Sequence, residues 1–586
     1  MRKTLTTVLI VAAAIAGFPW QAALAQVDVQ RLRLNDRVER DISGGETHSF
    51  RIDLRQGQFL LVTVQQPNID VVVRVRDPDG SLVRQVDDTG RTPESVTLFP
   101  RESGEYTIEI APFSRNVEPG RYAIEIERLE PAEQTKSGQV DQLLSPWDRT
   151  DAPGAAIAIV QDGEVVYKGG YGIAQLEYSV PITPSTVFSI ESDSKQFTAY
   201  AVAMLALQGR LSLDDDIHIY LPDLPDFGDL ITIRHLIHHT SGLRDQYTLM
   251  GLAGWGLDDV ITNDQVLRLV RRQRELNFSP GDDNLYCNTG YTLLAEIVSV
   301  VAGMPFPEWV AENIFLPLGM TNTHFHDARE VLVPNRAYAY LDQGGHFRKG
   351  VYTQGVGPSG VFTTVEDLVK WVRNLDDDQL GGPALHELIH TPGVLNSGDT
   401  LAYAFGMGIG QDRGLRTVGH GGGGVGGFNS YFVRYPDQGL AVIVLSNSGT
   451  FRPQSIAHRV AELFLSDQMQ VEQPKGAEPR QEQTTSVSRP EPWAPSAPEL
   501  LEYVGDYTSD ELATTYTVAV RDSALVATHI RYGPIALTPF PRARDTFISN
   551  THFFLRMVRF ERNDQDKITG YRVSGGNVRN ILFTKR

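Results

Sequence analysis

Apolar and polar residues alternate along residues 27–130, and turn sequences separate the alternating runs. Gly104–Ile110 and Gly120–Ile126 nearly repeat each other, and Phe59–Val64 and Val71–Val75 are further runs of strand length. This alternation is typical of strands with one face in a core, and Asp77-Pro-Asp-Gly80 between two runs is a turn sequence. We predict an N-terminal β-sandwich of jelly-roll type over residues 27–130.

From residue 138 to residue 468 the pattern changes, and helical and strand periodicities mix. Ala155–Val160 and Leu440–Leu445 are continuous apolar runs of strand length, which is typical of strands buried on both faces. They bracket a helical interior, so we predict one α/β unit with these runs as its first and last strands.

Residues 469–497 are polar and rich in proline, with almost nothing to bury, and we predict a linker there. Beyond it, residues 498–586 contain short alternating runs such as Tyr516–Val520, Ala524–Ala527 and Ile581–Phe583. Such runs predict short antiparallel strands, and we expect a small C-terminal β-barrel.

The N-terminus has the pattern of a secretory signal. Met1-Arg-Lys precedes an apolar run from Leu5 to Gly17, and Ala23-Leu-Ala25 forms a cleavage sequence before Gln26. Residues 1–25 are therefore expected to be removed, and the mature chain is expected in the periplasm or outside the cell. No later run of about 18 apolar residues predicts a transmembrane segment in the mature chain.

Composition narrows the possible partners. The chain has 586 residues, is 41% hydrophobic, and carries a formal net charge of −19, which becomes −21 without Arg2 and Lys3. This balance argues against nucleic acid as a partner, although it is equally typical of a solubilising surface. Cys287 is the single cysteine, so no internal disulfide is possible and packed cores must stabilise the fold.

Ser192 and Lys195 suggest a nucleophile site. They stand three apart at the start of a predicted amphipathic helix, so both lie on one face near a helix N-terminus. A serine hydroxyl attacks well only when a base takes its proton, and a lysine serves as that base only if its pKa is lowered. The apolar face of this helix is formed by Phe197, Ala201, Val202 and Leu205.

Two further stretches complement this pair. Tyr286 and Asn288 stand two apart just before another predicted helix. We expect a neighbouring Lys195 ammonium to favour the Tyr286 phenolate, so that the two residues activate each other. The glycine-rich stretch Gly419–Phe428 precedes a predicted strand, and its backbone N–H groups are free to bind an oxyanion. No phosphate-binding glycine motif and no G-x-S-x-G motif occurs in the chain.

Together these motifs resemble the penicillin-recognising serine hydrolases, in the branch of class C β-lactamases, D-aminopeptidases, DD-carboxypeptidases and related esterases. The resemblance rests on Ser192-x-x-Lys195, Tyr286-x-Asn288 and His420-Gly-Gly422, in the order of the family. Three more stretches match, namely Leu236-Ile-His-His-Thr-Ser-Gly-Leu243, Pro317-Leu-Gly-Met320 and Gly360–Leu368. The resemblance implies an antiparallel sheet flanked by helices, with a helical subdomain. The first domain more loosely resembles the prepeptidase C-terminal domains of secreted bacterial hydrolases.

The resemblance also implies roles for individual residues. Ser192 would be the acylating nucleophile, and Lys195 and Tyr286 would share proton transfer. Four residues would bind the substrate. Asn288 would hold the substrate amide, and His420 and Gly422 would lie on the strand beside the substrate. The N–H of Gly423 would form the oxyanion hole together with that of Ser192. No metal and no cofactor are expected. The expected substrate is a small molecule or a peptide, with a cell-wall peptide as one candidate.

Three positions depart from the family pattern. Asp193 stands where a small or apolar residue is usual, and a carboxylate facing Lys195 would raise the pKa of that lysine. Cys287 stands where Ser or Ala is common. His420 replaces a lysine, and a neutral imidazole anchors a substrate carboxylate less well than an ammonium. This last change argues for peptides with a free amine, esters or amides over β-lactams.

Other interpretations remain open. His386-Glu387-x-x-His390 matches a zinc protease motif, but no third ligand follows at the expected spacing. The chain could also be a binding or sensory module on a hydrolase fold, and Asp193 is the main argument for this. Two groups are read as structural, with metal binding as the alternative: the loop histidines His235, His238 and His239, and the turn aspartates Asp77, Asp79, Asp87 and Asp88. The sequence does not decide the oligomeric state.

Overall fold

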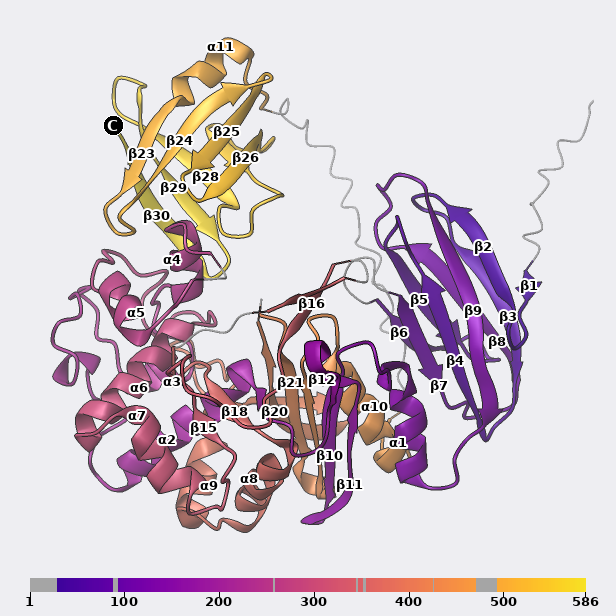
Figure 1. Ribbon diagram of the computed structural model, residues 1–586. Coiled ribbons are helices and arrows are strands. Elements are labelled where there is room, and N and C mark those ends of the chain that lie inside the picture. Colours follow the sequence, from indigo (N-terminus) through magenta and orange to yellow (C-terminus); the bar gives the residue numbers. More distant parts are fainter. Residues whose placement is uncertain are drawn as a thin grey trace, which may run out of the picture.

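The computed structural model describes residues 29–87, 93–256, 259–343, 346–350, 355–424, 426–470 and 493–586. The predicted signal peptide, Asp88 and most of the predicted linker lie outside the described residues. Figure 1 shows a β-sandwich, a central α/β unit and a C-terminal barrel, which follow one another along the chain. The predicted multidomain fold class is confirmed.

Two sheets face each other in the N-terminal sandwich. One has the order β1-β3-β8-β5-β6 and the other the order β2-β9-β4-β7. Alternate side chains such as Phe50, Ile52 and Leu54 of β3 point into a single apolar core between the sheets. The strands are β1 (Gln30–Arg31), β2 (Arg37–Ile42), β3 (His48–Leu54), β4 (Gln58–Gln65), β5 (Val71–Arg76), β6 (Leu82–Val86), β7 (Glu94–Leu98), β8 (Gly104–Pro112) and β9 (Gly120–Pro131).

A six-stranded antiparallel sheet with the order β11-β10-β22-β21-β20-β19 forms the centre of the molecule. Its first and last strands in the sequence, β10 and β22, pair in the middle of the sheet, with Ile157 opposite Val444. The strands are β10 (Ala155–Gln161), β11 (Glu164–Tyr171), β19 (Gly408–Asp412), β20 (Leu415–Gly423), β21 (Asn429–Tyr435) and β22 (Leu440–Ser446).

Helices cover both faces of this sheet, which explains the unbroken apolar runs of β10 and β22. Ile157 and Ile159 lie in the core with α1 (Lys136–Leu144) and α10 (Pro453–Leu465). Ala156, Ala158 and Val160 lie in the opposite core, with α2 (Lys195–Leu207) and α8 (Val365–Asp377). Successive side chains of a strand point to opposite faces, so both sets must be apolar.

The remaining helices of the central unit form a subdomain beside the sheet (Figure 1). They are α3 (Ile233–Ile237), α4 (Gln246–Leu252), α5 (Asn263–Val270), α6 (Asn288–Ala302), α7 (Phe306–Val310) and α9 (Gly382–Ile389). A small sheet has the strand order β14 (Phe188–Ser189), β18 (Val361–Thr363) and β15 (His324–Phe325). Its strand β14 ends just before the turn that contains Ser192. The hairpin-like pairs β12 (Ile173–Gln175) with β13 (Val180–Pro181) and β16 (Tyr340–Asp342) with β17 (Phe347–Lys349) complete the unit.

Among the described residues, no single helix is long and apolar enough to cross a membrane. One bent pair, Asn288–Ala302 with Phe306–Phe315, passes the length and composition test when its two parts are taken together. The first part is the buried core helix α6.

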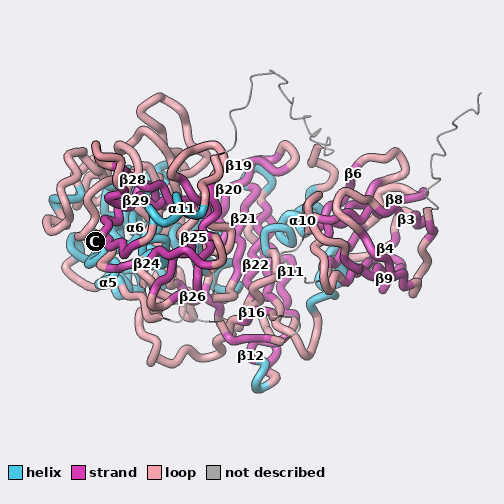
Figure 2. Tube along the Cα trace, turned by 90° about the horizontal axis from the view of Figure 1, so that it is seen from above, coloured by secondary structure: helices cyan, strands magenta, loops and turns pink. Residues whose placement is uncertain are grey.

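The C-terminal unit is a closed barrel of eight antiparallel strands with α11 (Ala497–Leu500) beside it. It packs on α4, where the hydroxyls of Tyr516 and Tyr532 donate to the backbone carbonyls of Leu252 at 3.0 Å and Gly251 at 2.7 Å. Figure 2 shows the barrel and the sandwich at opposite ends of the molecule. The strands are β23 (Gly505–Ser509), β24 (Thr514–Arg521), β25 (Ala524–His529), β26 (Tyr532–Pro539), β27 (Thr546–Ile548), β28 (Met557–Arg562), β29 (Ile568–Gly575) and β30 (Val578–Lys585).

Candidate active site

Ser192 lies in a tight turn rather than in the helix that was predicted to contain it. Residues Glu191–Ser194 form a 3₁₀ turn, and α2 begins at Lys195. Glu191, directly before the serine, has a φ of 47°, which is uncommon for a residue other than glycine. Backbone strain of this kind is often found beside reactive groups, because the surrounding structure has to impose it.

Lys195 is fully buried and lies within hydrogen-bond distance of three oxygen atoms. Its Nζ is 3.1 Å from Ser192 Oγ, 2.8 Å from Asn288 Oδ1 and 2.8 Å from the carbonyl oxygen of Pro358. Burial lowers the pKa of Lys195 to about 7, and the Asp245 carboxylate opposes that shift. Much of the lysine is therefore a neutral amine near pH 7.

The hydrogen-bond partners of the neutral amine determine where its N–H groups and its lone pair point. A neutral amine has two N–H donors and one lone pair, and the oxygens of Asn288 and Pro358 can only accept. These two oxygens therefore take both N–H groups, and the lone pair faces the hydroxyl of Ser192. Lys195 is oriented as a base for Ser192.

Asn288 is held in place by Asp245, a residue that sequence reasoning missed. Asn288 is the first residue of α6, and both its backbone N and its Nδ2 lie 2.8 Å from Asp245 Oδ2. Since Nδ2 donates to Asp245, Oδ1 is the atom that faces Lys195. Asp245 is also the N-cap of α4, where Oδ1 accepts from the backbone N–H groups of Tyr247 and Thr248. An aspartate before a helix is a recognisable N-cap signal, but it gives no hint of the Asn288 contact.

The ring of Tyr286 covers Lys195, whose Nζ lies 4.7 Å from the ring centroid. Burial raises the pKa of Tyr286 well above its usual range, and a hydrogen bond with Ser192 only partly opposes the rise. The expectation that Lys195 and Tyr286 stabilise a phenolate is therefore corrected. Desolvation is the largest effect on the pKa of this phenol, so Tyr286 keeps its proton and can donate it.

The strand β20 brings His420, Gly422 and Gly423 to the turn that carries Ser192. A Cβ atom on Gly422 would lie 2.0 Å from the carbonyl oxygen of Ile190, so only glycine allows this approach. The strand β19 pairs with β20 only as far as Gly419. In the part of the sheet that the structure describes, the outer edge of β20 from His420 to Gly423 thus has no paired strand. Its outward N–H and C=O groups can bind an extended substrate.

His420 is a neutral imidazole at the edge of the site. Burial lowers its pKa to about 4, with Lys195 adding to the shift. Its ring lies near those of Tyr286 and Tyr403, with centroids 6.2 Å and 5.8 Å away. The sequence-based expectation of a neutral histidine at this position agrees with this environment.

Asp193 points away from Lys195, towards Ser430 of β21. Ser430 Oγ lies 2.5 Å from Asp193 Oδ2 and 2.8 Å from the carbonyl oxygen of Ile190. A hydroxyl has one hydrogen and the carbonyl only accepts, so both contacts are satisfied when Ser430 donates to Ile190 and a protonated Asp193 donates to Ser430. Burial raises the pKa of Asp193 well above its usual range, which agrees with this assignment. Asp193 raises the pKa of Lys195 far less than burial lowers it.

Two more residues hold Tyr286 in place: His239, which the sequence predicts as a structural loop histidine, and Asn577, which sequence reasoning missed. The ring of His239 lies 4.3 Å from that of Tyr286, and its Nδ1 accepts the backbone N–H of Cys287 at 3.1 Å. Asn577, in the turn between β29 and β30 of the barrel, donates from Nδ2 to the carbonyl oxygen of Tyr286 at 2.8 Å. The carbonyl oxygen of the same asparagine accepts the backbone N–H of Asp245 at 3.4 Å.

The histidine motifs do not come together as metal sites in the part of the chain that the structure describes. Nδ1 of His386 lies 2.9 Å from Asp378, and Nδ1 of His390 lies 2.8 Å from the backbone carbonyl of His386. His235 belongs to the capping box of α3, which is a structural role. Within the described residues, three metal-ligating side chains lie within 4.8 Å of one another only at Asp70, Asp87 and Glu94 of the sandwich.

Comparison with known proteins identifies the family. Residues 139–465, more than half of the chain, match the Beta-lactamase family. Penicillin-binding protein 4* of Bacillus subtilis is 28% identical over 450 residues, which cover 73% of this chain and 93% of that protein. A D-aminopeptidase of Cereibacter sphaeroides is 30% identical over 335 residues, and these cover 56% of this chain and 62% of the relative.

The structure of the octameric penicillin-binding protein homologue from Pyrococcus abyssi has a similar fold. The TM-score is 0.50 at 23% identity, covering 77% of this chain and 99% of that one. The family match spans Ser192, Lys195, Tyr286 and the glycine-rich strand. This chain belongs to the beta-lactamase family and is a serine hydrolase of that fold.

Proposed function

We propose that this protein is an exported serine hydrolase that forms an acyl-enzyme at Ser192 with peptide amides or esters. The observation that carries the proposal is the buried Lys195, whose lone pair faces Ser192 because Asn288 and Pro358 take its N–H groups. A base with a pKa near the working pH is the most effective general base. The activity classes of its relatives, D-aminopeptidase and penicillin-binding protein, support amide or ester substrates.

In acylation, Ser192 Oγ attacks the carbonyl carbon of the substrate while its proton passes to Lys195 Nζ. The N–H groups of Ser192 and Gly423 are the proposed oxyanion hole for the negative oxygen that forms. The protonated Tyr286 donates to the leaving amine or alkoxide, and Lys195 returns its proton to Tyr286. Water then attacks the acyl-enzyme with the same groups in reverse order.

The substrate class follows from the electrostatics of the β20 edge. His420 is neutral, so it offers no ammonium that would bind a substrate carboxylate. The unpaired edge of β20 suits an extended peptide-like segment, with Asn288 beside its amide. We propose D-amino amides, short peptides or esters as substrates, with β-lactams reacting more slowly.

Export is part of the proposal and rests on the N-terminal sequence. The apolar run and the Ala23-Leu-Ala25 sequence support cleavage before Gln26. N-terminal sequencing of the protein secreted by its native host tests this. A mature N-terminus at Gln26 is expected. A protein that stays in the cytoplasm with residues 1–25 still attached would contradict export.

A fluorophosphonate probe with mass spectrometry tests the serine hydrolase mechanism. Labelling requires an activated hydroxyl and an oxyanion site together, so we expect one label, on Ser192, and none in Ser192→Ala. Tyr286→Phe should label and turn over an activated ester at least about 100-fold more slowly. A chelator should change neither rate. A folded protein that is not labelled at any pH would favour the binding-module alternative.

A comparison of substrates tests the proposed specificity. With equal enzyme, D-amino amides or short-chain esters are expected to give a higher kcat/KM than a cephalosporin reporter. Hydrolysis of the reporter near the diffusion range of about 10⁸ M⁻¹s⁻¹ would contradict the specificity and leave the acyl-enzyme mechanism intact.

A further inference from the structure

A cavity of about 380 Å³ lies between the sandwich and the central unit, away from Ser192. It is bounded by β6, the end of β7 and the loop after it on one side, and by α1, α10 and the turn between β19 and β20 on the other. Leu82, Leu98 and Phe99 form part of its apolar wall. This volume is within the usual range of small-molecule sites, about 300–1,000 Å³.

Positive charge gathers on the walls of this cavity. Its lining includes five cationic side chains and three acidic ones, which leaves a formal charge of +2. The acidic residues are Asp77, Glu102 and Glu462, and the cationic residues are Arg84, Arg101, Lys136, Arg413 and Arg459. Both domains contribute, so the charge cluster exists only when they are docked.

Three guanidinium groups share one carboxylate at the centre of this cluster. Arg101 lies 2.7 Å from Glu462, Arg413 lies 3.2 Å from it and Arg84 lies 3.3 Å from it. These arginines lower the pKa of Glu462 although burial raises it, so Glu462 is ionised. Arg413 also lies 3.5 Å from Asp412, so Glu462 is the acidic partner of Arg84 and Arg101 in particular.

Arg84 has spare donor capacity at this point. Its side chain is 20% exposed, and its Nε is buried without a hydrogen-bond partner. A buried N–H donor of a charged group without an acceptor costs free energy, and arginine prefers carboxylate or phosphate oxygens. The cavity therefore combines a partly exposed arginine whose Nε is unsatisfied, a formal positive charge on its walls and an apolar wall.

We propose that this interdomain cavity binds a small organic anion, with its acidic group at Arg84 and Arg101 and its apolar part against Leu82, Leu98 and Phe99. The ligand would contact both domains and strengthen their docking. The site is separate from Ser192, because α10 and Ser192 lie on opposite sides of the central sheet. Its ligand is thus not the hydrolysed substrate.

Isothermal titration with 2-naphthalenesulfonate, which the hydrolase cannot cleave, tests the proposal. The protein is first phosphonylated at Ser192, or carries Ser192→Ala, so that active-site binding is excluded. We expect saturable binding with one site per chain. Neutral 2-naphthol should bind at least about tenfold more weakly, because it lacks the anionic group. Inorganic phosphate should compete, because it offers the same oxygens to Arg84.

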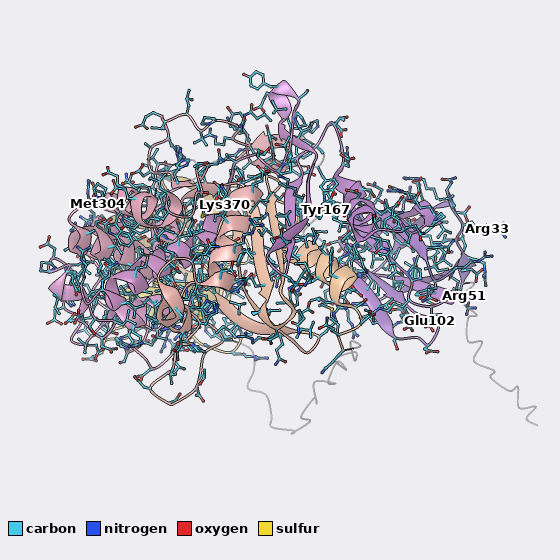
Figure 3. All side chains as sticks on the ribbon, turned by 90° about the horizontal axis from the view of Figure 1, so that it is seen from below. Arg33, Arg51, Glu102, Tyr167, Met304 and Lys370 are labelled. Carbon is cyan, nitrogen blue, oxygen red and sulfur yellow. The ribbon has the colours of Figure 1, made fainter. Side chains whose placement is uncertain are left out.

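The double variant Arg84→Gln/Arg101→Gln should weaken the anion's binding at least about tenfold. The matched control is Arg33→Gln, an exposed arginine at the outer edge of the sandwich in Figure 3, which should bind within about twofold of the parent. If the double variant does not fold, Arg413→Gln replaces it from the hydrolase side. No saturable binding up to roughly 10 mM, or equal binding by the parent and the variants, would overturn the proposal.

Discussion

At the scale of single residues, the site depends on where protons reside among buried groups. Burial pushes the pKa of Lys195 down and the pKa values of Tyr286 and Asp193 up, so each group is driven towards its neutral form. The result is a neutral base beside the nucleophile and a protonated phenol that can act as an acid. An ammonium–phenolate pair is disfavoured at these positions, because burial removes the water that would solvate the two charges.

The first prediction concerns the pH dependence of acylation. Since Lys195 acts as a neutral base with a pKa of about 7, kcat/KM for an activated ester should rise with pH and level off above about 7. Lys195→Arg should be inactive throughout, because a guanidinium remains protonated and cannot accept the proton. A pH–rate profile of both proteins is the measurement. A flat profile between about pH 5.5 and 8 would contradict the role of Lys195.

The second prediction concerns Asp193, which the structure assigns as a protonated donor to Ser430. Asp193→Asn should keep kcat/KM within about threefold and leave the pH profile in place, because an amide N–H can replace the carboxyl O–H. Asp193→Val should lower the free energy of unfolding by about 1–3 kcal/mol through the lost hydrogen bond. Urea unfolding and pH–rate profiles measure these effects. A shift of the profile to lower pH in Asp193→Asn would mean that Asp193 is ionised, since removing that charge lowers the pKa of Lys195.

At the scale of elements, the site is assembled from chain ends and turns. Ser192 precedes α2, Asn288 opens α6, Asp245 caps α4, and β20 ends at the glycines. The turn between β29 and β30 joins them from the barrel. Its Gly576 has a φ of 52°, and a Cβ there would lie 2.8 Å from Thr248 Oγ1, so glycine allows the turn to reach α4.

The third prediction follows from the contacts of Asn577 with Tyr286 and Asp245. Asn577→Ala removes the donor to the Tyr286 carbonyl, so we expect kcat for an activated ester to fall about tenfold with little change in KM. The matched control is Asn563→Ala in another turn of the barrel, where the side chain accepts only from its own turn. Steady-state kinetics compares the kcat of the two variants, and melting curves show whether either variant is destabilised. Equal kcat values for both variants would show that the turn does not position Tyr286.

At the scale of the whole molecule, both outer domains dock on the central unit through ion pairs, which are buried on the barrel side and partly buried on the sandwich side. On the barrel side, the fully buried Arg244 side chain lies 2.8 Å from Glu511 of the barrel. On the sandwich side, Glu462 of α10 forms ion pairs with Arg84 and Arg101 of the sandwich. Removing one partner of a buried ion pair leaves an uncompensated charge, which makes such pairs sensitive points of docking.

The fourth prediction tests whether sandwich docking and catalysis are independent. Glu462→Gln should lower the free energy of unfolding by roughly 1–3 kcal/mol, because the partly buried Arg84 and Arg101 lose their counter-charge while Arg413 keeps Asp412. It should leave kcat/KM within about twofold, because α10 lies across the sheet from Ser192. Chemical unfolding and ester hydrolysis measure the two effects. Glu39→Gln, on an exposed pair with Arg37, is the control and should change neither. A large loss of activity in Glu462→Gln would show that the sandwich acts on the site.

The sequence by itself determined the features that depend on local spacing. Alternation predicts the sandwich and barrel strands, and the apolar runs of β10 and β22 predict strands covered on both faces. The spacing of Ser192 and Lys195 predicts their adjacency, although not the 3₁₀ turn between Glu191 and Ser194. These inferences succeed because strand and helix periodicities are set by neighbouring residues.

Only the tertiary structure decided which buried groups carry a proton, which way their hydrogen bonds run, and which residues hold the catalytic side chains in place. Pro358 contributes only a backbone oxygen, which no side-chain motif records. Asn577 stands 291 residues beyond Tyr286 in the sequence, yet hydrogen-bonds to it. Whether Asp193 faces Lys195 or Ser430, and how far burial shifts each pKa, depends on packing between distant segments. Local patterns specify which elements form, but desolvation and hydrogen-bond geometry exist only once those elements are packed together.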